Sequence, residues 1–427
     1  MKKVSKKQRL IIAISILLLL IILATVITSN INNNSKIANE GYLATTANAS
    51  SNLVADYIKK GITIGGITGT LETLDTSDAT ATAADIAKGK TAYVKGEKII
   101  GTRIDTVAQA KEAQQAFSEN KILIDDYGNN VKVPAGFKIS EDSATSVTGG
   151  VVIEDVSAGD ENTKGSQFVW IPVGDNITDE SGSKTTITLG RYDFGSDGTP
   201  TPVQAAENWS KEVAILTYYI ELAKSNYGNT TAKNLEEFVT KATTSGGYYI
   251  GRYEAGDAYA TSTARTDSTS DSNPVVCKSG VYPYNNVTQS QASILSQGMY
   301  NSSNFESDLV NSYAWDTAIV FIQTFSGDTN YSRQDGKNTR VDIQRCGESI
   351  LYSVDGGDKP QDVRCNIYDM AGNTRELTTE SYSDSRYPCV PRGGDYGDRI
   401  YYTSGRIGSC ATIDYDAYGS FRLTLYL

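Results

Sequence analysis

Histidine is absent from this chain of 427 residues. Because histidine is the commonest general base and metal ligand, its absence removes every catalytic triad and metal site that depends on imidazole. Basic residues are also in short supply, with 39 Lys and Arg against 50 Asp and Glu and a net charge of -11. Such a chain has no basic surplus to neutralise the phosphates of a polynucleotide, so we expect no nucleic-acid partner.

Cysteine is scarce and is confined to the C-terminal part. The five cysteines are Cys277, Cys346, Cys365, Cys389 and Cys410, and none belongs to a C-x-x-C pair. This spacing does not support a metal cluster or a thioredoxin-like site. The odd number leaves at least one thiol free, and both disulfides and buried free thiols are open for the others.

A long hydrophobic run occurs at the N-terminus. Basic residues within 1–9 precede an apolar run from Leu10 to Ile27, which only Ser15 and Thr25 interrupt. About 18 such residues nearly span a hydrocarbon core of roughly 30 Å, and the flanking lysines favour an N-terminus inside the cell. We therefore expect a cytoplasmic tail over 1–9, a single transmembrane helix over 10–28 and a cell-membrane protein with an extracellular C-terminal part. A cleaved signal peptide is the alternative.

The next part of the sequence is modular. Residues 29–50 are rich in Asn, Ser, Ala and Thr and are typical of a linker. Residues 51–105 contain two related segments, because Val54-Ala-Asp-Tyr-Ile-Lys-Lys-Gly61 before Ile67-Thr-Gly-Thr70 is echoed by Ala83-Ala-Asp-Ile-Ala-Lys-Gly89 before Ile99-Ile-Gly-Thr102. They are similar to short repeats of phage tail fibres and bacterial surface proteins, and we expect a β-rich stalk. A coincidental similarity is the alternative.

Residues 106–164 form a predicted connector of helix and strands. Residues 106–119 are rich in good helix formers. Residues 122–133 alternate around a turn at Gly128 and predict a hairpin. Further along, apolar residues recur near helical spacing over 305–324 and predict an amphipathic helix.

Three signatures follow in fixed order near the C-terminus. They are Asn366-Ile-Tyr-Asp-Met-Ala-Gly-Asn-Thr-Arg-Glu376, Arg392-Gly-Gly-Asp-Tyr396 and Ser420-Phe-Arg422. Together with Phe168–Val173 and Gly247–Glu254, they resemble the domain of the formylglycine-generating enzyme (sulfatase-modifying factor) family over residues 165–427. The resemblance implies a C-type-lectin-like fold, so the expected fold class is α+β, with a transmembrane helix and small β-rich repeats before that domain.

The family's catalytic cysteines are not matched. The resemblance places them at Asp398 and Thr403, and a soft Cu(I) site needs thiolate or thioether ligands. We therefore expect a protein that is not an enzyme. A formylglycine-generating-type oxidase is the alternative.

Residues 395–418 have a restricted composition. The segment consists of Tyr, Asp, Gly, Ser, Thr, Arg, Ile, Ala and one Cys. Tyr with Ser, Gly and Asp is typical of antibody paratopes, and the segment resembles the variable region of proteins diversified by diversity-generating retroelements. The predicted ligand-binding residues are Asp395, Tyr396, Asp398, Arg399, Tyr401, Tyr402, Ser404, Arg406, Tyr415 and Tyr418. Because the chain has 27 Tyr, a Tyr-rich loop without a special role is the alternative.

The resemblance also implies a structural calcium ion. Its ligands are expected at Asp369, Gly372, Thr374 and Glu376. Carboxylate and carbonyl oxygens suit this hard cation, but Arg375 and Leu377 replace two tryptophans of the family pattern. A turn with a salt bridge is the alternative.

These patterns together predict a membrane-anchored, surface-displayed protein that binds an extracellular protein or glycan through a diversified site on a lectin-like scaffold. The alternatives are the oxidase and a structural surface or tail-fibre-like protein.

Overall fold

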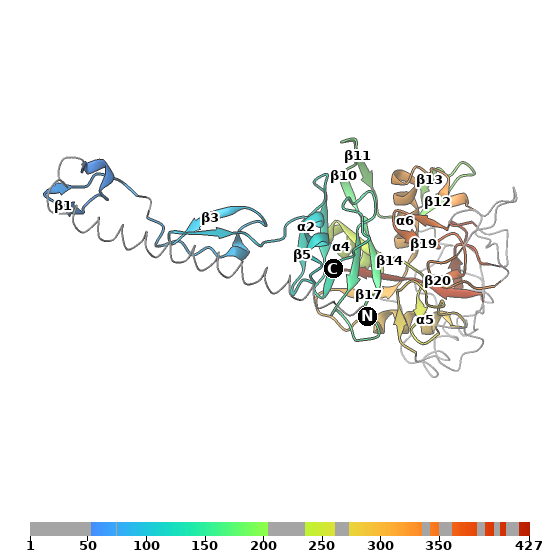
Figure 1. The fold of residues 1–427 in the computed structure, drawn as a ribbon. Coiled ribbons are helices and arrows are strands. Elements are labelled where there is room, and N and C mark those ends of the chain that lie inside the picture. Colours follow the sequence, from blue (N-terminus) through green and yellow to red (C-terminus); the bar gives the residue numbers. More distant parts are fainter. Residues whose placement is uncertain are drawn as a thin grey trace, which may run out of the picture. The chain divides into compact units, whose positions relative to one another are not determined.

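The computed structural model describes residues 53–73, 75–203, 235–260, 273–334, 342–349, 361–381, 389–396, 402–406 and 418–427 (Figure 1). The chain divides into two compact units, Met1–Thr82 with Thr91–Ile99, and Ala83–Lys90 with Ile100–Leu427. The short elements at the start of the described chain are η2 (Ala55–Tyr57), β1 (Thr63–Ile64), β2 (Ile67–Thr68), η3 (Ala83–Asp85), β3 (Thr91–Val94) and β4 (Glu97–Ile100).

Residues 53–73 and 83–103 share a pattern of backbone hydrogen bonds. The Thr70 amide donates to the Ala55 carbonyl at 2.8 Å, and the Thr102 amide donates to the Ala83 carbonyl at 2.8 Å. A glycine precedes each threonine. A Cβ at Gly69 would lie 2.1 Å from the Ile58 carbonyl oxygen, and one at Gly101 would lie 2.3 Å from the carbonyl oxygens of Ile86 and Ala87. The two segments therefore have matching local folds that depend on these glycines.

The segment 53–73, here called the first module, has almost no interior. Ile58 is its one buried hydrophobic side chain among the described residues. Both side chains of β1 are exposed, as is that of Thr68 in β2. A two-stranded hairpin with one buried side chain is at best marginally stable by itself.

A six-stranded antiparallel sheet organises the larger unit (Figure 1). In spatial order its strands are β17 (Glu306–Leu309), β23 (Leu423–Tyr426), β14 (Gly247–Gly251), β9 (Gln167–Pro172), β8 (Val152–Asp155) and β7 (Phe137–Ile139). In β9, Phe168 and Trp170 belong to one core cluster, whereas Val169 and Ile171 belong to another. Because side chains alternate along a strand, the sheet is covered on both faces.

Four helices supply part of that cover. They are α2 (Val107–Ala113), α4 (Leu235–Ser245), α5 (Gln289–Gly298) and α6 (Ser312–Phe325). Helices α4 and α6 pack on the face of Val169, with Phe238 and Trp315 among their buried side chains. Helices α2 and α5 contribute Val107 and Ala292 to the opposite face.

The remaining strands form small sheets. Their bounds are β5 (Lys121–Ile124), β6 (Asn130–Val133), β10 (Gly174–Thr178), β11 (Lys184–Ile187), β12 (Tyr192–Phe194), β13 (Pro200–Pro202), β15 (Gly256–Asp257), β16 (Val275–Val276), β18 (Val363–Arg364), β19 (Ile367–Tyr368), β20 (Arg375–Ser381), β21 (Cys389–Arg392) and β22 (Gly419–Phe421), with the short helix η4 (Tyr331–Arg333). The predicted hairpin is confirmed, since Ile122 pairs with Lys132 in β5–β6.

Both predicted helices are shorter than expected. Helix α2 begins after Thr106, which caps it, and ends where Gln114 adopts a left-handed conformation with φ of 49°. The predicted helix over 305–324 is divided, because residues 306–309 form β17 and pair with β23 before α6 begins. The apolar spacing therefore located the helix but not its start.

The predicted fold class is wrong. The described residues are β-rich with few helices, and no lectin-like fold is shown for 165–427. No helix in the described ranges is long and apolar enough to cross a membrane. Helix α6, with 14 residues, rises about 21 Å, which is less than a hydrocarbon core of roughly 30 Å. The predicted single-pass membrane localisation is corrected on the same finding. The segments on which it was based, 1–9 and 10–28, and the predicted linker lie outside the described residues.

Candidate functional site

The three C-terminal signatures meet in one small sheet. Strand β20 lies between β21, to which it is antiparallel, and β22, to which it is parallel. In this register Glu376 is opposite Arg392 on one side and Ser420 on the other. Each of these three residues comes from a different signature, so the fold brings the three segments of the pattern into direct contact.

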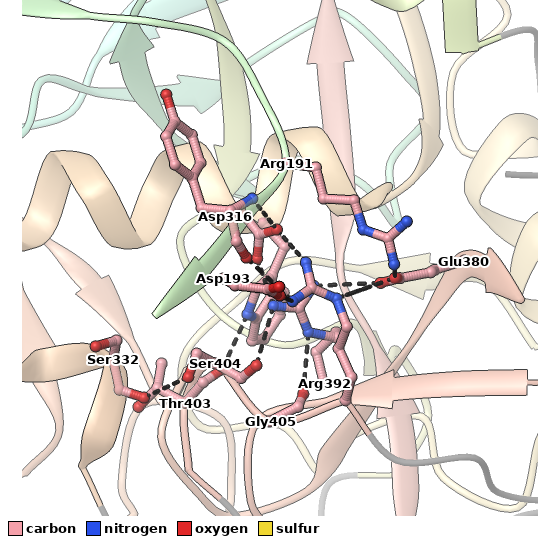
Figure 2. A network of polar contacts seen from close by, with 12 residues as sticks. Arg191, Asp193, Asp316, Ser332, Glu380, Arg392, Thr403, Ser404 and Gly405 are labelled. Carbon is pink, nitrogen blue, oxygen red and sulfur yellow. Dashed lines mark hydrogen bonds and ion pairs between the residues drawn. The ribbon is translucent and has the colours of Figure 1, made fainter. Parts of the chain in front are cut away.

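Arg392 ends β21 and is fully buried. Its guanidinium pairs with Asp316 of α6 and, at 3.3 Å, with Glu380 of β20 (Figure 2). Its Nε donates to the Gly405 carbonyl at 3.0 Å. Burial, followed by the nearby Arg406, lowers the pKa of Arg392 from its ordinary value. Arg392 thus joins a helix, a strand and the loop at Gly405.

Arg406 belongs to the same network. Its guanidinium pairs with Asp316 and, at 3.0 Å, with Glu380, and it lies 3.4 Å from the carboxylate of Asp193. Burial opposes the charged form, but Asp316 and Glu380 outweigh it and raise the pKa of Arg406. Arg406 was predicted to pair with a ligand anion. In the structure its guanidinium forms ion pairs inside the fold.

A third guanidinium, that of Arg191, also pairs with Glu380 (Figure 2). Asp316 and Glu380 are both completely buried, whereas the side chain of Asp193 is 74% exposed. Removing either buried carboxylate would leave one buried carboxylate for the three guanidinium groups, which is strongly unfavourable. We call this group, Arg191, Asp316, Glu380, Arg392 and Arg406, the ionic network.

The ionic network fixes residues 402–406. Gly405 accepts from Arg392, and the Ser404 hydroxyl donates to the Ser332 carbonyl at 2.8 Å. Thr403, at a position where the family has a catalytic cysteine, is buried, and its carbonyl accepts from the Trp315 indole at 3.0 Å. This segment is held as firmly as a core element.

An aromatic pair marks the two ends of the predicted variable segment. The rings of Tyr396 and Tyr418 stack with centroids 5.4 Å apart and planes at 29°. The Arg375 guanidinium lies 5.7 Å from the Tyr418 ring centroid, and 3.9 Å from the buried carboxylate of Asp395. Tyr396 is partly exposed and Tyr418 is 47% exposed. Stacked aromatic surface beside a cation is thus accessible here, as is typical of binding hot spots.

Tyr402, which also belongs to residues 395–418, likewise has an arginine beside its ring. The guanidinium of Arg333 lies 4.1 Å from the ring centroid of Tyr402, within the range of a cation–π contact. Both side chains are partly exposed. The sequence did not predict Arg333 or Arg375 as ligand-site residues, because neither belongs to the restricted segment and only the fold brings them to its tyrosines.

A second buried group supports the same sheet. The Arg422 Nε donates to both carboxylate oxygens of Glu376, at 3.0 and 2.8 Å. Glu254, at the end of the β14 segment, accepts from the Thr374 amide at 3.0 Å and from the Asn373 side chain at 2.6 Å. Burial, with the negative charge of Glu376, raises the pKa of Glu254 to about 8. Burial therefore favours the protonated form of Glu254.

These contacts involve the predicted calcium ligands. Glu376 is paired with Arg422, the Thr374 hydroxyl bonds to Glu254, and one oxygen of Asp369 accepts from the Gly347 amide at 2.7 Å. Within the described part of the chain, no group of three or more His, Cys, Asp or Glu side chains is arranged to hold a metal ion. Glu376 is thus the partner of Arg422 in the structure. The calcium ion that the resemblance implies stays a prediction.

Several predicted site residues lie outside the described residues: Asp398, Arg399, Tyr401 and Tyr415. Sequence analysis missed Asp316 and Glu380. One signal was available for Asp316, because it is a lone carboxylate within the largely apolar run of α6. Such a residue is rarely buried without a partner.

The cysteines of the described chain are free thiols: Cys277, Cys346, Cys365 and Cys389. Burial raises the pKa of Cys277 to about 11 and that of Cys365 to about 12. Thiols with such pKa values carry little thiolate at neutral pH and are poor nucleophiles.

Comparison with known proteins adds little. No family model matches the chain, and no curated protein matches it. Among solved structures, one described as the crystal structure of CarF is similar at 15% sequence identity, over 42% of this chain and 87% of that chain, with a TM-score of 0.27. A similarity at this level assigns neither a fold nor an activity.

Proposed function

We propose that this chain is a binding protein whose ligand site is centred on the tyrosines of residues 395–418. The observation that carries the proposal is that some residues of this segment are buried or ion-paired, whereas others are exposed. Arg406, Thr403 and Asp395 are buried or engaged in ion pairs, whereas Tyr396 and Tyr418 present stacked, partly exposed rings. A rigid frame that carries accessible aromatic side chains suits recognition, because little side-chain entropy is lost on binding.

The chemistry of the described site favours a ligand with planar or apolar surface. Tyr402 and Tyr418 each have an arginine beside the ring, Arg333 and Arg375, and Arg375 also lies 3.9 Å from the Asp395 carboxylate. Tyrosine rings of this kind offer rigid, amphipathic contact area to a ligand. We propose a protein or glycan ligand.

Two findings weigh against the oxidase alternative. Asp398 and Thr403 stand where the family has cysteines, and the Thr403 carbonyl is a structural acceptor for Trp315. The described thiols are buried, and those of Cys277 and Cys365 have raised pKa values. Copper oxidase chemistry would need thiolates at the site.

Sequencing tests whether the segment is diversified. The flanking DNA and sibling isolates should contain a near-identical template repeat, beside a reverse transcriptase, whose adenines coincide with variable codons within 395–418. An invariant segment without a template would show that these tyrosines do not belong to a diversified site.

A binding screen tests the proposal without relying on diversification. The full chain would be applied to a glycan array and to a displayed-peptide library. Binding that Tyr418→Ala abolishes and Tyr259→Ala preserves would support the site, because Tyr259 is 64% exposed but lies outside the segment. Equal effects of both substitutions would contradict it.

A further inference from the structure

The first module, residues 53–73, exposes an unusual share of large apolar side chains. Tyr57 is 78% exposed, and four further residues are between 42% and 51% exposed. The full set is Val54, Tyr57, Ile62, Ile64 and Leu71. Single exposed apolar residues are ordinary on protein surfaces, but five within about twenty residues are a local concentration of exposed apolar surface.

The module lacks the interior that would stabilise it alone. Ile58 is its one buried hydrophobic side chain among the described residues. The ion pair between Lys60 and Glu72 has side chains that are 68% and 76% exposed, so it contributes little. Ordering the backbone has a conformational cost at every residue, and one buried isoleucine cannot offset that cost over the whole module. Covering its exposed apolar side chains would therefore stabilise the described segment.

Charge indicates what that partner is. Asp56 and Glu72 balance Lys59 and Lys60, so two negative charges cancel two positive charges and the module is neutral, in a chain with a net charge of -11. Two copies of an acidic chain repel one another least when they meet through a segment that carries no net charge. A neutral apolar surface also has no charge with which to select a different, oppositely charged protein.

The related segment 83–103 is not electrically neutral. Lys88, Lys90, Lys95, Lys98 and Arg103 stand against Asp85 and Glu97, so five positive charges less two negative charges leave +3. Copies of this segment would repel one another. The two segments share a backbone pattern, but the first one alone is both apolar outside and uncharged overall.

We propose that residues 53–73 associate with the same segment of further copies of this chain, through Val54, Tyr57, Ile62, Ile64 and Leu71, and that the protein is a homo-oligomer. The exposed β-branched residues and the unpaired edges of a two-stranded hairpin favour such packing. If the proposed binding function holds, each oligomer carries several copies of the ligand site. Its avidity for a repetitive ligand then exceeds the affinity of one site.

Sedimentation velocity of the full chain tests the proposal. All samples would contain the same non-ionic detergent, because the apolar run from Leu10 to Ile27 is present in every variant. Wild type is expected to sediment as one discrete oligomer at about 10 μM, within the range of ordinary protein–protein affinities. The double substitution Ile62→Lys with Ile64→Lys is expected to sediment as a monomer.

Ile122→Lys is the matched control. Ile122 is 57% exposed, close to the 50% and 51% of Ile62 and Ile64, but it lies outside the first module. This variant is expected to keep the oligomeric state of wild type. A monomeric wild type, or a double variant that stays oligomeric, would overturn the proposal.

Cross-linking keeps the test decisive if the lysine variants fold poorly. Tyr57→Cys is expected to give disulfide-linked copies after mild oxidation, because the proposal places the highly exposed position 57 in the interface between neighbouring copies. Tyr259→Cys, also highly exposed at 64%, is expected to remain uncross-linked under the same conditions. Equal cross-linking at both positions would contradict a specific interface in the module.

Discussion

Asp316 of α6 and Arg392 of β21 form an ion pair in which neither side chain is exposed to solvent. The pair links the packed helix of the main sheet to the small sheet that holds the three C-terminal signatures. Arg406 bonds to the same carboxylate from the predicted variable segment. The frame of the proposed binding site is therefore part of the protein's buried interior.

Breaking this pair should destabilise the protein. Asp316→Asn leaves Glu380 as the one buried carboxylate that pairs with Arg392 and Arg406 among the described residues, and we expect a loss of about 3–5 kcal/mol in the free energy of unfolding. Asp193→Asn is the control, since Asp193 pairs with Arg406 but its side chain is 74% exposed. Its expected loss is about 0–1 kcal/mol. Urea unfolding followed by fluorescence measures both, and equal losses would contradict a special role for the buried carboxylate.

Stability should fall as the pH rises from about 4.5 to about 8. The pKa of Glu254 is raised from 4.5 to about 8 by burial and by Glu376, so the folded protein keeps a proton that the unfolded chain releases above about 4.5. The stabilisation is complete below that value and is lost as the pH approaches 8. Burial also raises the pKa of Asp369 well above its ordinary value, which acts in the same direction.

Glu254→Gln tests the assignment. The amide keeps the size of the protonated carboxyl and does not titrate, so unfolding free energies measured at pH 5, 7 and 8.5 should depend less on pH than those of wild type. Some dependence should remain because of Asp369. Identical slopes in the two proteins would show that Glu254 does not carry the proton.

Gly69 and Gly101, which precede Thr70 and Thr102, should not tolerate a side chain. In Gly69→Ala, the new methyl group would lie 2.1 Å from the Ile58 carbonyl oxygen, so residues 53–73 should become sensitive to protease while the melting temperature of the larger unit stays unchanged. Gly298→Ala is the control, since nothing lies within 4 Å of its Cβ position. Limited proteolysis with mass spectrometry distinguishes the two, and equal protection would contradict the matched local fold.

Tyr418→Ala should weaken binding without a comparable loss of stability. Once the array or peptide screen provides a ligand, titration calorimetry should show a loss of about 30-fold in affinity, as for a hot-spot residue. Tyr418 is 47% exposed, so the loss of its ring leaves no large cavity. Unchanged affinity would exclude the stacked pair of Tyr396 and Tyr418 from the site.

Local features of this protein followed from the sequence alone. The hairpin across Gly128 has the expected strands, because its alternation and turn residues act over a few positions. The absence of histidine is also a property of the sequence. The restricted composition of residues 395–418 pointed to the tyrosines that form the accessible pair.

Long-range pairing decided the rest. The start of the predicted helix over 305–324 became β17, because β23, more than a hundred residues later, offers it a hydrogen-bonding edge. Such pairing overrides local spacing, because strand formation depends on the neighbours that the fold supplies.

Arg406 shows the same difference between what the sequence predicts and what the fold decides. Composition made Arg406 a candidate for ligand contact, but its partners Asp316 and Glu380 are 90 and 26 residues away in the chain. The sequence by itself determined which residue types the C-terminal segment contains. Only the tertiary structure decided which of them are buried in ion pairs and which face solvent, because burial and charge pairing depend on neighbours that the fold brings together.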